Sequence, residues 1–404
     1  MKQRDIIITG LQDFNAEIGS NAVNLAREFS RHHRVLYVNY PLDRLSRWRQ
    51  RKHPAVKQRL EVIKQRKSPL HKVHDRLWVY TPDALLESVS KIPVQWLFDK
   101  LLYINNKRYA SEVRSAIRQL GFQNYLLFED SDLYRTLYFK ELLQPDLFLY
   151  YSRDNITATP YYRRHGARIE ALMMKKADAV VCNSAYLDNL AKSHNHQSYD
   201  VGQGVDTGLF TEKPTKLPEV LKDVRKPIIG YIGVLSAMRL DVRLLEQVAA
   251  ANSQWVFCLV GPEDEAFKAS TLHRMEHVIF TGRQPYEALP SYLHAFDAAI
   301  NPQIVNSVTI GNYPRKIDEY LAAAKPVVAV KTEAMKMFSD TVFLAENATE
   351  FAAMCSEALQ VKDQKKEMRR QVALSHSWEN SAQRIYAVIE NIEKQKKNEP
   401  ARKD

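Results

Sequence analysis

The feature that most constrains this chain is an alternation of short apolar strands with amphipathic helices, which runs once, stops at a polar segment and then starts again. The first series opens with a strand at 5–9, a helix whose apolar residues recur from Ile18 to Phe29, and a second strand at 34–39. A strand, a helix and a strand in so short a stretch form a βαβ unit, whose crossover connection requires a parallel sheet. Further buried strands of this series are predicted at 124–128, 146–151 and 178–182.

The alternation resumes at Pro227, after a segment rich in Lys, Pro and Glu, with strands at 227–233, 255–260, 277–281, 297–300 and 326–330. A chain of 404 residues exceeds the ~250–300 residues at which a single hydrophobic core stops growing. We therefore predict an α/β fold with two Rossmann-like, doubly wound parallel-sheet domains that face each other across a cleft. The predicted organisation is a first domain at 1–210, a linker at 211–226, a second domain at 227–375, a helix at 376–393 that crosses back to the first domain, and a disordered tail at 394–404.

The composition is that of a globular protein from a reducing compartment. Hydrophobic residues make up 45% of the chain and charged residues 26%, which is far from the balance of a disordered chain. The three cysteines are far apart, and none belongs to a C-x-x-C pair, which argues against a disulfide framework and a cysteine-rich metal site. No apolar run approaches the ~20 residues that a membrane span needs. The sequence therefore predicts a soluble, cytoplasmic protein.

The positive charge is concentrated in one stretch. The formal net charge is +11, and much of it lies between Arg44 and Arg76, where acidic residues are few. Trp48, Leu60 and Leu70 stand among these charges, and such a mixture suits an element that lies on anionic lipid headgroups. A charged helix in solvent would have the same composition, so both interpretations stay open. The chain shows neither an RNA-binding aromatic signature nor a helix-turn-helix pattern, so we expect no nucleic-acid partner.

The segment 312–328 is the most informative for function. It predicts a helix that is opened by Pro314, preceded by the permissive residues Gly311 and Asn312, and followed directly by a buried strand. A helix start offers free backbone N–H groups and the positive end of a dipole, and both suit a diphosphate. Glu319 lies about one turn further in, where a carboxylate can accept both hydroxyls of a ribose. An ordinary amphipathic helix before a core strand is the alternative.

This segment resembles the donor-binding signature of GT-B glycosyltransferases of the family 4-like group, which runs Pro, x, Lys, x, x, Glu-Tyr-Leu-Ala, x, x, Lys-Pro-Val-Val. The resemblance implies that Glu319 holds the ribose of a nucleotide-sugar donor and that Pro314 and Lys316 shape the diphosphate loop. Many members carry a Glu eight residues before the position of Glu319, and this chain has Gly311 there. The donor-binding residues that the resemblance implies are Gly233, Arg239, Gly282, Arg283, Gly311, Asn312, Tyr313, Pro314, Lys316 and Glu319.

Other stretches of the second half fit the same resemblance. Residues 229–241 correspond to the first donor loop of the family, and Arg239 stands where most members have a Lys on the donor diphosphate. A surface Arg in solvent is the alternative for Arg239. Residues 280–293 look like the strand and loop that contact the nucleotide base, and residues 376–378 resemble the start of the final helix.

The first domain matches the family only in pattern, as acceptor domains do because they diverge with the acceptor. Arg153 and Asp154 follow a strand at its carboxyl end, where open α/β sheets bind their ligands. Asp154 is the candidate catalytic carboxylate near the acceptor, and a helix N-cap is an equally good role for it. Residues 200–210 look like a family element that ends this domain at the cleft, although a turn into the linker needs the same glycines. The acceptor-side candidates are Gly19, Arg153 and Gly204.

The resemblance implies a glycosyltransferase that moves a sugar from a nucleotide-sugar donor to a hydroxyl of a glycan or lipid-linked acceptor, usually in cell-surface polysaccharide biosynthesis. It further implies a retaining reaction without a metal or other cofactor, since the nucleotide-sugar is a substrate. The D-x-D-like run at 129–132 is typical of metal sites in the other large glycosyltransferase fold, and we interpret it as unrelated to a metal. A nucleotide-sugar epimerase on the same fold and a non-catalytic nucleotide-sugar-binding protein remain the alternatives.

Overall fold

The computed structural model describes residues 3–15, 20–49, 56–57, 60, 68–214, 216–306, 309–310, 313–361 and 365–398. The chain divides into two compact units. Unit 1 comprises Met1–Gly202 together with Ser381–Asp404, and unit 2 comprises Gln203–Asn380.

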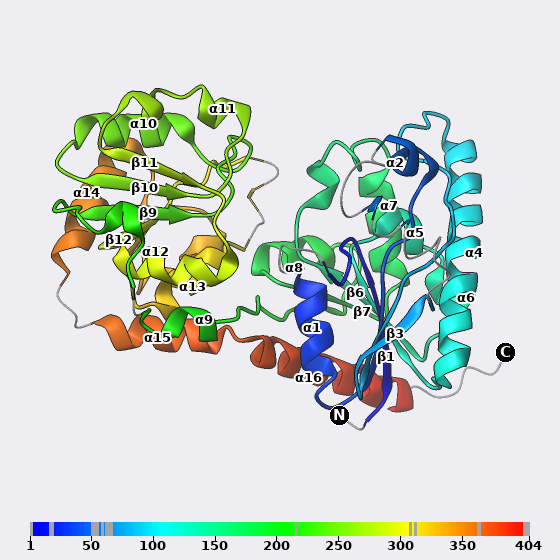
Figure 1. The fold of residues 1–404 in the computed structure, drawn as a ribbon. Helices are drawn as coiled ribbons and strands as arrows, with labels where there is room; N and C mark the ends of the chain where they lie inside the picture. Colours follow the sequence, from blue (N-terminus) through cyan, green and yellow to red (C-terminus); the bar gives the residue numbers. More distant parts are fainter. Residues whose placement is uncertain are drawn as a thin grey trace. The chain divides into compact units, whose positions relative to one another are not determined.

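Unit 1 is built on a sheet whose parallel strands all end at one edge (Figure 1). Within the described residues this sheet has eight strands in the order β3-β4-β2-β1-β5-β6-β7-β8, and every neighbouring pair is parallel except β3 with β4. The central strands β1, β5 and β6 are buried at every residue, because helices cover both faces of the sheet. The strands are β1 (Asp5–Gly10), β2 (Arg34–Val38), β3 (Leu70–His74), β4 (Leu77–Tyr80), β5 (Leu126–Asp130), β6 (Leu147–Ser152), β7 (Ala179–Cys182) and β8 (Ser198–Asp200).

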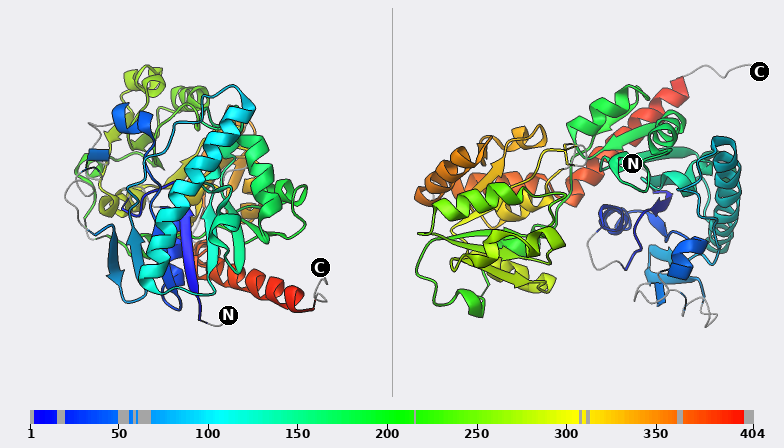
Figure 2. Two further views of the ribbon diagram at one scale, coloured as in Figure 1. Left: turned by 90° about the vertical axis from the view of Figure 1, so that its right-hand side faces the viewer. Right: turned by 90° about the horizontal axis from the view of Figure 1, so that it is seen from above.

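The helices of unit 1 lie on both faces of its sheet. On one face, α4 crosses in front of the strands in the left-hand view of Figure 2, and its apolar residues recur at helical spacing. It ends at Gly121, whose left-handed φ of 61° closes the helix. On the other face, Phe29 of α1 packs against Phe128 of β5 and Tyr386 of α16, with ring centroids 5.7 and 5.6 Å apart. The helices are α1 (Asn21–Phe29), α2 (Arg44–Arg49), α4 (Gln95–Leu120), α5 (Leu133–Thr136), α6 (Phe139–Leu143), η1 (Ile156–Ala158), α7 (Gly166–Lys176), α8 (Ala185–Lys192) and α16 (Trp378–Asn398), of which α16 starts in unit 2.

Unit 2 repeats the architecture with a fully parallel sheet. Its described residues form six strands in the order β11-β10-β9-β12-β13-β14. Alternate residues of each strand face opposite layers, so one side of the sheet packs on α12 and α13 and the other on α10 and α14. The strands are β9 (Ile228–Ile232), β10 (Val256–Val260), β11 (Val278–Gly282), β12 (Ala298–Asn301), β13 (Val327–Val330) and β14 (Phe343–Ala345).

Some helices of unit 2, such as α10, begin with a side-chain cap where they follow a strand. Asp241, for example, accepts a hydrogen bond from the backbone N–H of Leu244 at the start of α10, which satisfies an N–H that has no partner within the helix. The helices are α9 (Gly208–Thr211), η2 (Glu219–Leu221), α10 (Val242–Ala251), α11 (Glu265–Lys268), η3 (Thr271–Arg274), η4 (Tyr286–Ala288), α12 (Leu289–Ala295), α13 (Arg315–Ala322), η5 (Ala334–Phe338), α14 (Ala348–Gln360) and α15 (Lys366–Ser375).

The first domain was predicted to end at 210, whereas unit 2 already begins at Gln203, and two further predicted boundaries also differ from the structure. The segment 211–226, expected as a linker, lies inside unit 2, because Leu221 is buried in the core of that unit. The predicted tail begins at 394, whereas α16 continues through Asn398. Lys396 Nζ in this last turn lies 3.0 Å from Asp178 Oδ1 and donates to the Asp146 carbonyl at 3.2 Å, which explains why the charged end of the helix is ordered.

Candidate functional site

Two glycine turns close the carboxyl ends of neighbouring strands in unit 2. Gly233 follows β9 and Gly261 follows β10, each with a φ of 146°. A Cβ built on Gly261 would lie 1.9 Å from the carbonyl oxygen of Gly233, so no side chain fits there. Both turns therefore expose backbone at this edge of the sheet, and a ligand can approach it closely.

The Gly233 turn lies at the point where the strand order of unit 2 reverses. β9 pairs with β10 on one side and with β12 on the other, and the chain reaches β12 only after the β10 and β11 connections. In open parallel α/β sheets, ligands bind outside the carboxyl ends of the strands at such a reversal. The predicted donor residues that follow β9 and β12 therefore share the favoured edge.

Lys316 brings a cation to this edge from α13. Its Nζ donates to the Tyr231 hydroxyl at 2.6 Å and lies 4.4 Å from the centre of the Tyr231 ring. A Cβ on Gly233 would lie 3.2 Å from the same Nζ. Because Tyr231 is almost fully buried at the end of β9, it holds the ammonium group at a defined place beside the Gly233 turn.

Glu319 places a carboxylate one turn inside α13. Its side chain is 14% exposed, and Oε1 lies 3.6 Å from Arg315 Nη2. Burial raises the pKa of Glu319, and the positive charges of Arg315 and Lys316 oppose that rise. Burial also raises the pKa of the Tyr286 hydroxyl to about 12, with the nearby charge of Glu319 adding to the rise. The helix itself starts after Pro314 without a side-chain cap on its first N–H groups.

Backbone hydrogen bonds join the loop that carries Arg239 to the loop that follows β12. The Arg239 carbonyl accepts from the Ile304 N–H at 2.9 Å, and Leu240 and Gln303 form an antiparallel bridge. The amide of Asn306 reinforces this contact by donating to the Met238 carbonyl at 3.0 Å. The exposed Arg239 side chain therefore starts from backbone that is fixed against the segment leading to α13.

Gly282 and Arg283 lie further along the same edge, at the end of β11. Gly282 has a φ of 66°, and a Cβ there would meet nothing within 4 Å, so glycine is favoured by conformation rather than by space. Arg283 is exposed. β11 is separated from β9 by β10, so these two residues are further from the Gly233 turn than Lys316 is.

In unit 1, the strand order reverses between β1 and β5, and a buried ion pair lies at the carboxyl ends of these strands. Asp130, at the end of β5, accepts from Arg153 Nε at 2.6 Å, and Arg153 Nη1 donates to Asp154 Oδ2 at 3.0 Å. A Cβ on Gly10 would lie 3.0 Å from the Cβ of Asp130. Burial raises the pKa of Asp130, and the Arg153 guanidinium opposes the rise. The Asp154 side chain is 35% exposed, which leaves it accessible from solvent at this edge.

Comparison with known proteins finds a family that is similar to part of unit 2. Residues 226–361 match the family model described as Glycosyl transferases group 1. This part of the chain is therefore similar to the group 1 glycosyltransferases. TuaH of Bacillus subtilis (strain 168), named for a glycosyltransferase of teichuronic acid biosynthesis, is 28% identical over 224 residues, which cover 52% of this chain and 56% of TuaH. The aligned part thus spans little more than half of that relative.

Solved structures of glycosyltransferases share the fold over nearly the whole chain. The crystal structure of Anabaena HepE in complex with UDP and glucose has a TM-score of 0.66 at 14% identity and covers 96% of this chain and 99% of HepE. A UDP-forming α,α-trehalose-phosphate synthase from Burkholderia vietnamiensis has a TM-score of 0.68 at 10% identity, covering 97% and 98%. The predicted GT-B class, with two parallel-sheet α/β domains, is confirmed.

Several predicted site residues lie outside the described residues or have surroundings that the sequence did not suggest. Gly19, Gly311 and Asn312 lie outside the described residues. Gly204 belongs to unit 2, where a Cβ would lie 2.2 Å from Trp378 Cε3, so this glycine makes room for an indole ring. Tyr313 turns its hydroxyl inward, to the carboxylate of Asp318.

The sequence interpretation missed two buried contacts, one in each unit. Asp318 is fully buried and contacts His376, 58 positions later, with 2.7 Å between Oδ1 and Nδ1. Asp130 was part of the D-x-D-like run, all of which is buried in the structure. Its partner Arg153 was identified, but nothing in the sequence pairs the two. Within the described part of the chain, no group of three or more His, Cys, Asp or Glu side chains could hold a metal ion.

Only part of the basic stretch 44–76 falls within the described residues, and that part is not one helix. α2 ends at Arg49, and β3 pairs antiparallel with β4. Residues 50–55, 58–59 and 61–67 are outside the description. Edge position explains the strand, since β3 needs only one neighbour and can keep its charged side chains in solvent.

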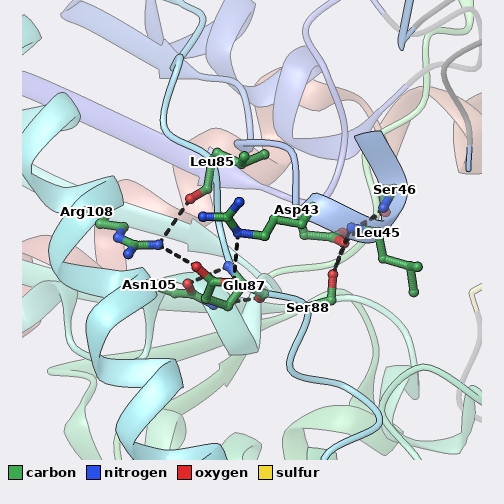
Figure 3. A network of polar contacts seen from close by, with 9 residues as sticks. Asp43, Leu45, Ser46, Leu85, Glu87, Ser88, Asn105 and Arg108 are labelled. Atoms are coloured by element: carbon green, nitrogen blue, oxygen red, sulfur yellow. Dashed lines mark hydrogen bonds and ion pairs between the residues drawn. The ribbon is translucent and has the colours of Figure 1, made fainter. Parts of the chain in front are cut away.

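α2 buries no side chain, yet polar contacts fix it to the rest of unit 1 (Figure 3). Asp43 caps the helix by accepting from the backbone N–H groups of Leu45 and Ser46, each at 3.0 Å. Leu45 N–H also donates to Ser88 Oγ at 3.0 Å. Glu87 Oε1 accepts from Arg108 Nη1 of α4 at 3.0 Å, and its other oxygen accepts from Arg44 at 2.9 Å. These contacts fix the backbone of α2, from which its basic residues and Trp48 project into solvent. Trp48 is 66% exposed.

Proposed function

We propose that this chain is a glycosyltransferase that moves a sugar from a nucleotide-sugar donor to a hydroxyl of a glycan or lipid-linked acceptor, without a metal and with retention of anomeric configuration. The observation that carries the proposal is the juxtaposition of the Gly233 turn, the Lys316 ammonium and the start of α13 at the strand-order reversal of unit 2. This arrangement offers backbone N–H groups, a positive charge and a helix dipole to a diphosphate. Glu319, one turn further along α13, would accept hydrogen bonds from the ribose hydroxyls.

The same groups fit the charge that develops during transfer. The bond between the anomeric carbon and the diphosphate oxygen breaks, the acceptor oxygen bonds to that carbon, and the proton of the acceptor hydroxyl passes to the leaving diphosphate. The leaving nucleoside diphosphate gains negative charge, which Lys316 and Arg239 would offset from a prearranged position. Asp154, exposed beside Arg153, is our candidate for the carboxylate near the acceptor.

The relatives favour particular substrates. The HepE structure contains UDP and glucose, and the trehalose-phosphate synthase is named as UDP-forming, so we propose a UDP-sugar as donor. TuaH is named for teichuronic acid biosynthesis, which favours an acceptor from cell-surface polysaccharide assembly.

Calorimetric titration with UDP, GDP, ADP and dTDP tests the donor site directly. We expect UDP to bind the wild-type protein and Glu319→Ala to weaken binding at least tenfold, the loss of a charged hydrogen-bond partner being worth ~1.5–3 kcal/mol. Glu357→Ala, on the exposed side of α14, is the matched control and should bind like the wild type. The proposal fails if none of the four nucleotides binds, or if Glu319→Ala binds as tightly as the control. Incubation with the UDP-sugar alone, followed by analysis for its epimer, separates transfer from epimerisation.

We further propose that unit 1 contacts an anionic membrane surface on the cytoplasmic side. The exposed side of α4 carries Trp96, Lys100, Tyr103 and Lys107 at helical spacing, with Trp96 68% and Tyr103 43% exposed. Exposed tryptophans beside cations suit the headgroup region of an anionic bilayer. Trp48 of α2 adds a second such group. Within the described residues, no helix is both long enough and apolar enough to span a membrane.

Flotation with vesicles of phosphatidylcholine, with and without phosphatidylglycerol, tests this contact. We expect the wild type to float with the anionic vesicles only, and Trp48→Ala with Trp96→Ala to remain largely in the dense fraction. Leu172→Ala with Leu190→Ala, two exposed apolar residues on α7 and α8, is the control. Flotation that ignores the anionic lipid, or a tryptophan variant that floats like the control, would contradict the membrane proposal.

A further inference from the structure

Asp318 belongs to the predicted donor helix but turns to its buried side. Its Oδ2 accepts from the Tyr313 hydroxyl at 2.7 Å, and its Oδ1 lies 2.7 Å from His376 Nδ1. Because a carboxylate can only accept, His376 Nδ1 carries the proton of that contact. The Tyr313 hydroxyl also lies 3.0 Å from His376 Nδ1, so the three polar groups form a closed triangle. Asp318 is fully buried and only 13% of the His376 side chain is exposed.

His376 also connects this triangle to the two segments through which the chain enters and leaves unit 2. Its carbonyl accepts from the Val205 N–H at 2.8 Å, and Val205 and Ser377 form a parallel bridge. Gly204 lies so close to Trp378 that a Cβ would be 2.8 Å from the Trp378 Cα. The unit boundaries at Gly202/Gln203 and Asn380/Ser381 are a few residues away. One residue therefore joins both connecting segments to α13.

The orientation of α13 depends on such contacts. It has eight residues and no side-chain cap, and a helix this short is not stable by itself. On the opposite side from His376, the Tyr320 hydroxyl accepts from the Ile232 N–H at 2.9 Å and so ties α13 to the end of β9. Successive residues of a helix point about 100° apart, so fixing Asp318 and Tyr320 also fixes the directions of Lys316 and Glu319.

We propose that Asp318 and His376 are positioning residues for the donor site, which hold α13 so that Lys316 and Glu319 face the nucleotide. The inference rests on the proposed function, because it assigns the ligand of α13 as a nucleoside diphosphate. Loss of either partner leaves the other buried with Tyr313 as its remaining polar neighbour in the triangle, and loosens the start of the helix. The two residues act as one unit, so the effect of losing both is close to the effect of losing one.

The test is a double-mutant cycle with UDP as the titrated probe. We expect His376→Ala and Asp318→Ala each to raise the Kd for UDP about tenfold, and the double variant to raise it no further. His376→Asn, whose amide can donate from nearly the position of Nδ1, should restore most of the affinity. His277→Ala is the control. His277 is likewise partly buried and hydrogen-bonded, to the Ala249 carbonyl, but it lies just before β11, the outermost strand on the far side of β9 from α13's strand β13.

The outcomes separate a positioning role from a purely structural one. If His376→Ala lowers the melting temperature as His277→Ala does and leaves the Kd for UDP unchanged, the inference is wrong. Independent, additive effects of the two substitutions would also overturn it. Tyr313→Phe removes one hydroxyl of the same triangle without leaving a cavity, so it gives a reading even where Asp318→Ala does not fold. Failure of the proposed function would appear earlier, as absence of UDP binding to the wild type.

Discussion

Gly261→Ala is predicted to destabilise unit 2 far more than Gly282→Ala, although both glycines end strands of the same sheet. At Gly282 the added Cβ meets no atom within 4 Å, so the cost is that of a left-handed backbone, about 1–2 kcal/mol. At Gly261 the φ of 146° is itself unfavourable, and the Cβ would lie 1.9 Å from the Gly233 carbonyl oxygen. Relief of that overlap requires the two turns to separate, which strains the hydrogen bond from Gly233 N–H to the Val260 carbonyl. Strain and overpacking together lead us to expect a loss of about 4 kcal/mol.

Urea unfolding of the wild type and the two variants measures this difference. The Gly282→Ala midpoint should fall slightly, and the Gly261→Ala midpoint should fall at least twice as far at an unchanged slope. UDP titration adds a second reading, because separated turns no longer present their backbone beside Lys316. Equal midpoints for the two variants would refute the steric reasoning and show that the turns move apart at little cost.

Three further predictions concern buried charges and thiols. Burial lowers the pKa of Lys325 to about 8, so the unfolded chain binds more protons than the folded chain between pH 8 and 10.5. As the pH rises through that window, the free energy of unfolding of the wild type should therefore increase by up to about 3 kcal/mol relative to that of Lys325→Met. Equal pH profiles of the two proteins in urea unfolding would contradict this. Arg153→Met leaves Asp130 buried and unpaired and should cost ~3–5 kcal/mol, whereas adding Asp130→Asn should recover much of it, as melting temperatures would report. The thiols of Cys182, Cys258 and Cys355 are buried, and burial raises the pKa of each. Iodoacetamide should therefore label the native protein negligibly and the denatured protein at all three cysteines, as mass spectrometry would show.

Most of the strands that the sequence predicted are buried on both sides of a sheet, and β11, a partly buried edge strand, is an exception. Strands such as β5 and β6 read as continuous apolar runs, which local composition can identify. β3 carries Lys72 between two histidines and is exposed at four of its five positions, so neither alternation nor an apolar run marks it as a strand. Its pairing with β4 depends on a neighbour across a turn. Likewise, the last turn of α16 has the composition of a tail, and contacts of Lys396 with Asp178 and with the Asp146 carbonyl, both more than two hundred positions earlier, explain its order.

The candidate site divides along the same physical line. Groups that would meet a ligand stand at strand ends and helix starts, which are local features. Pro314 and Glu319 could therefore be proposed from the sequence pattern, and Lys316 and the strand-end glycines from the resemblance to the family signature. The groups that hold them in place come from other parts of the chain: Tyr231 contacts Lys316 across 85 positions, and His376 contacts Asp318 across 58. No local pattern relates such pairs, because their contact exists only in the folded unit. In the sequence, Asp318 is simply the residue before Glu319. In the folded helix their side chains point about 100° apart, so Glu319 faces the proposed ligand site while Asp318 anchors the helix from its buried side.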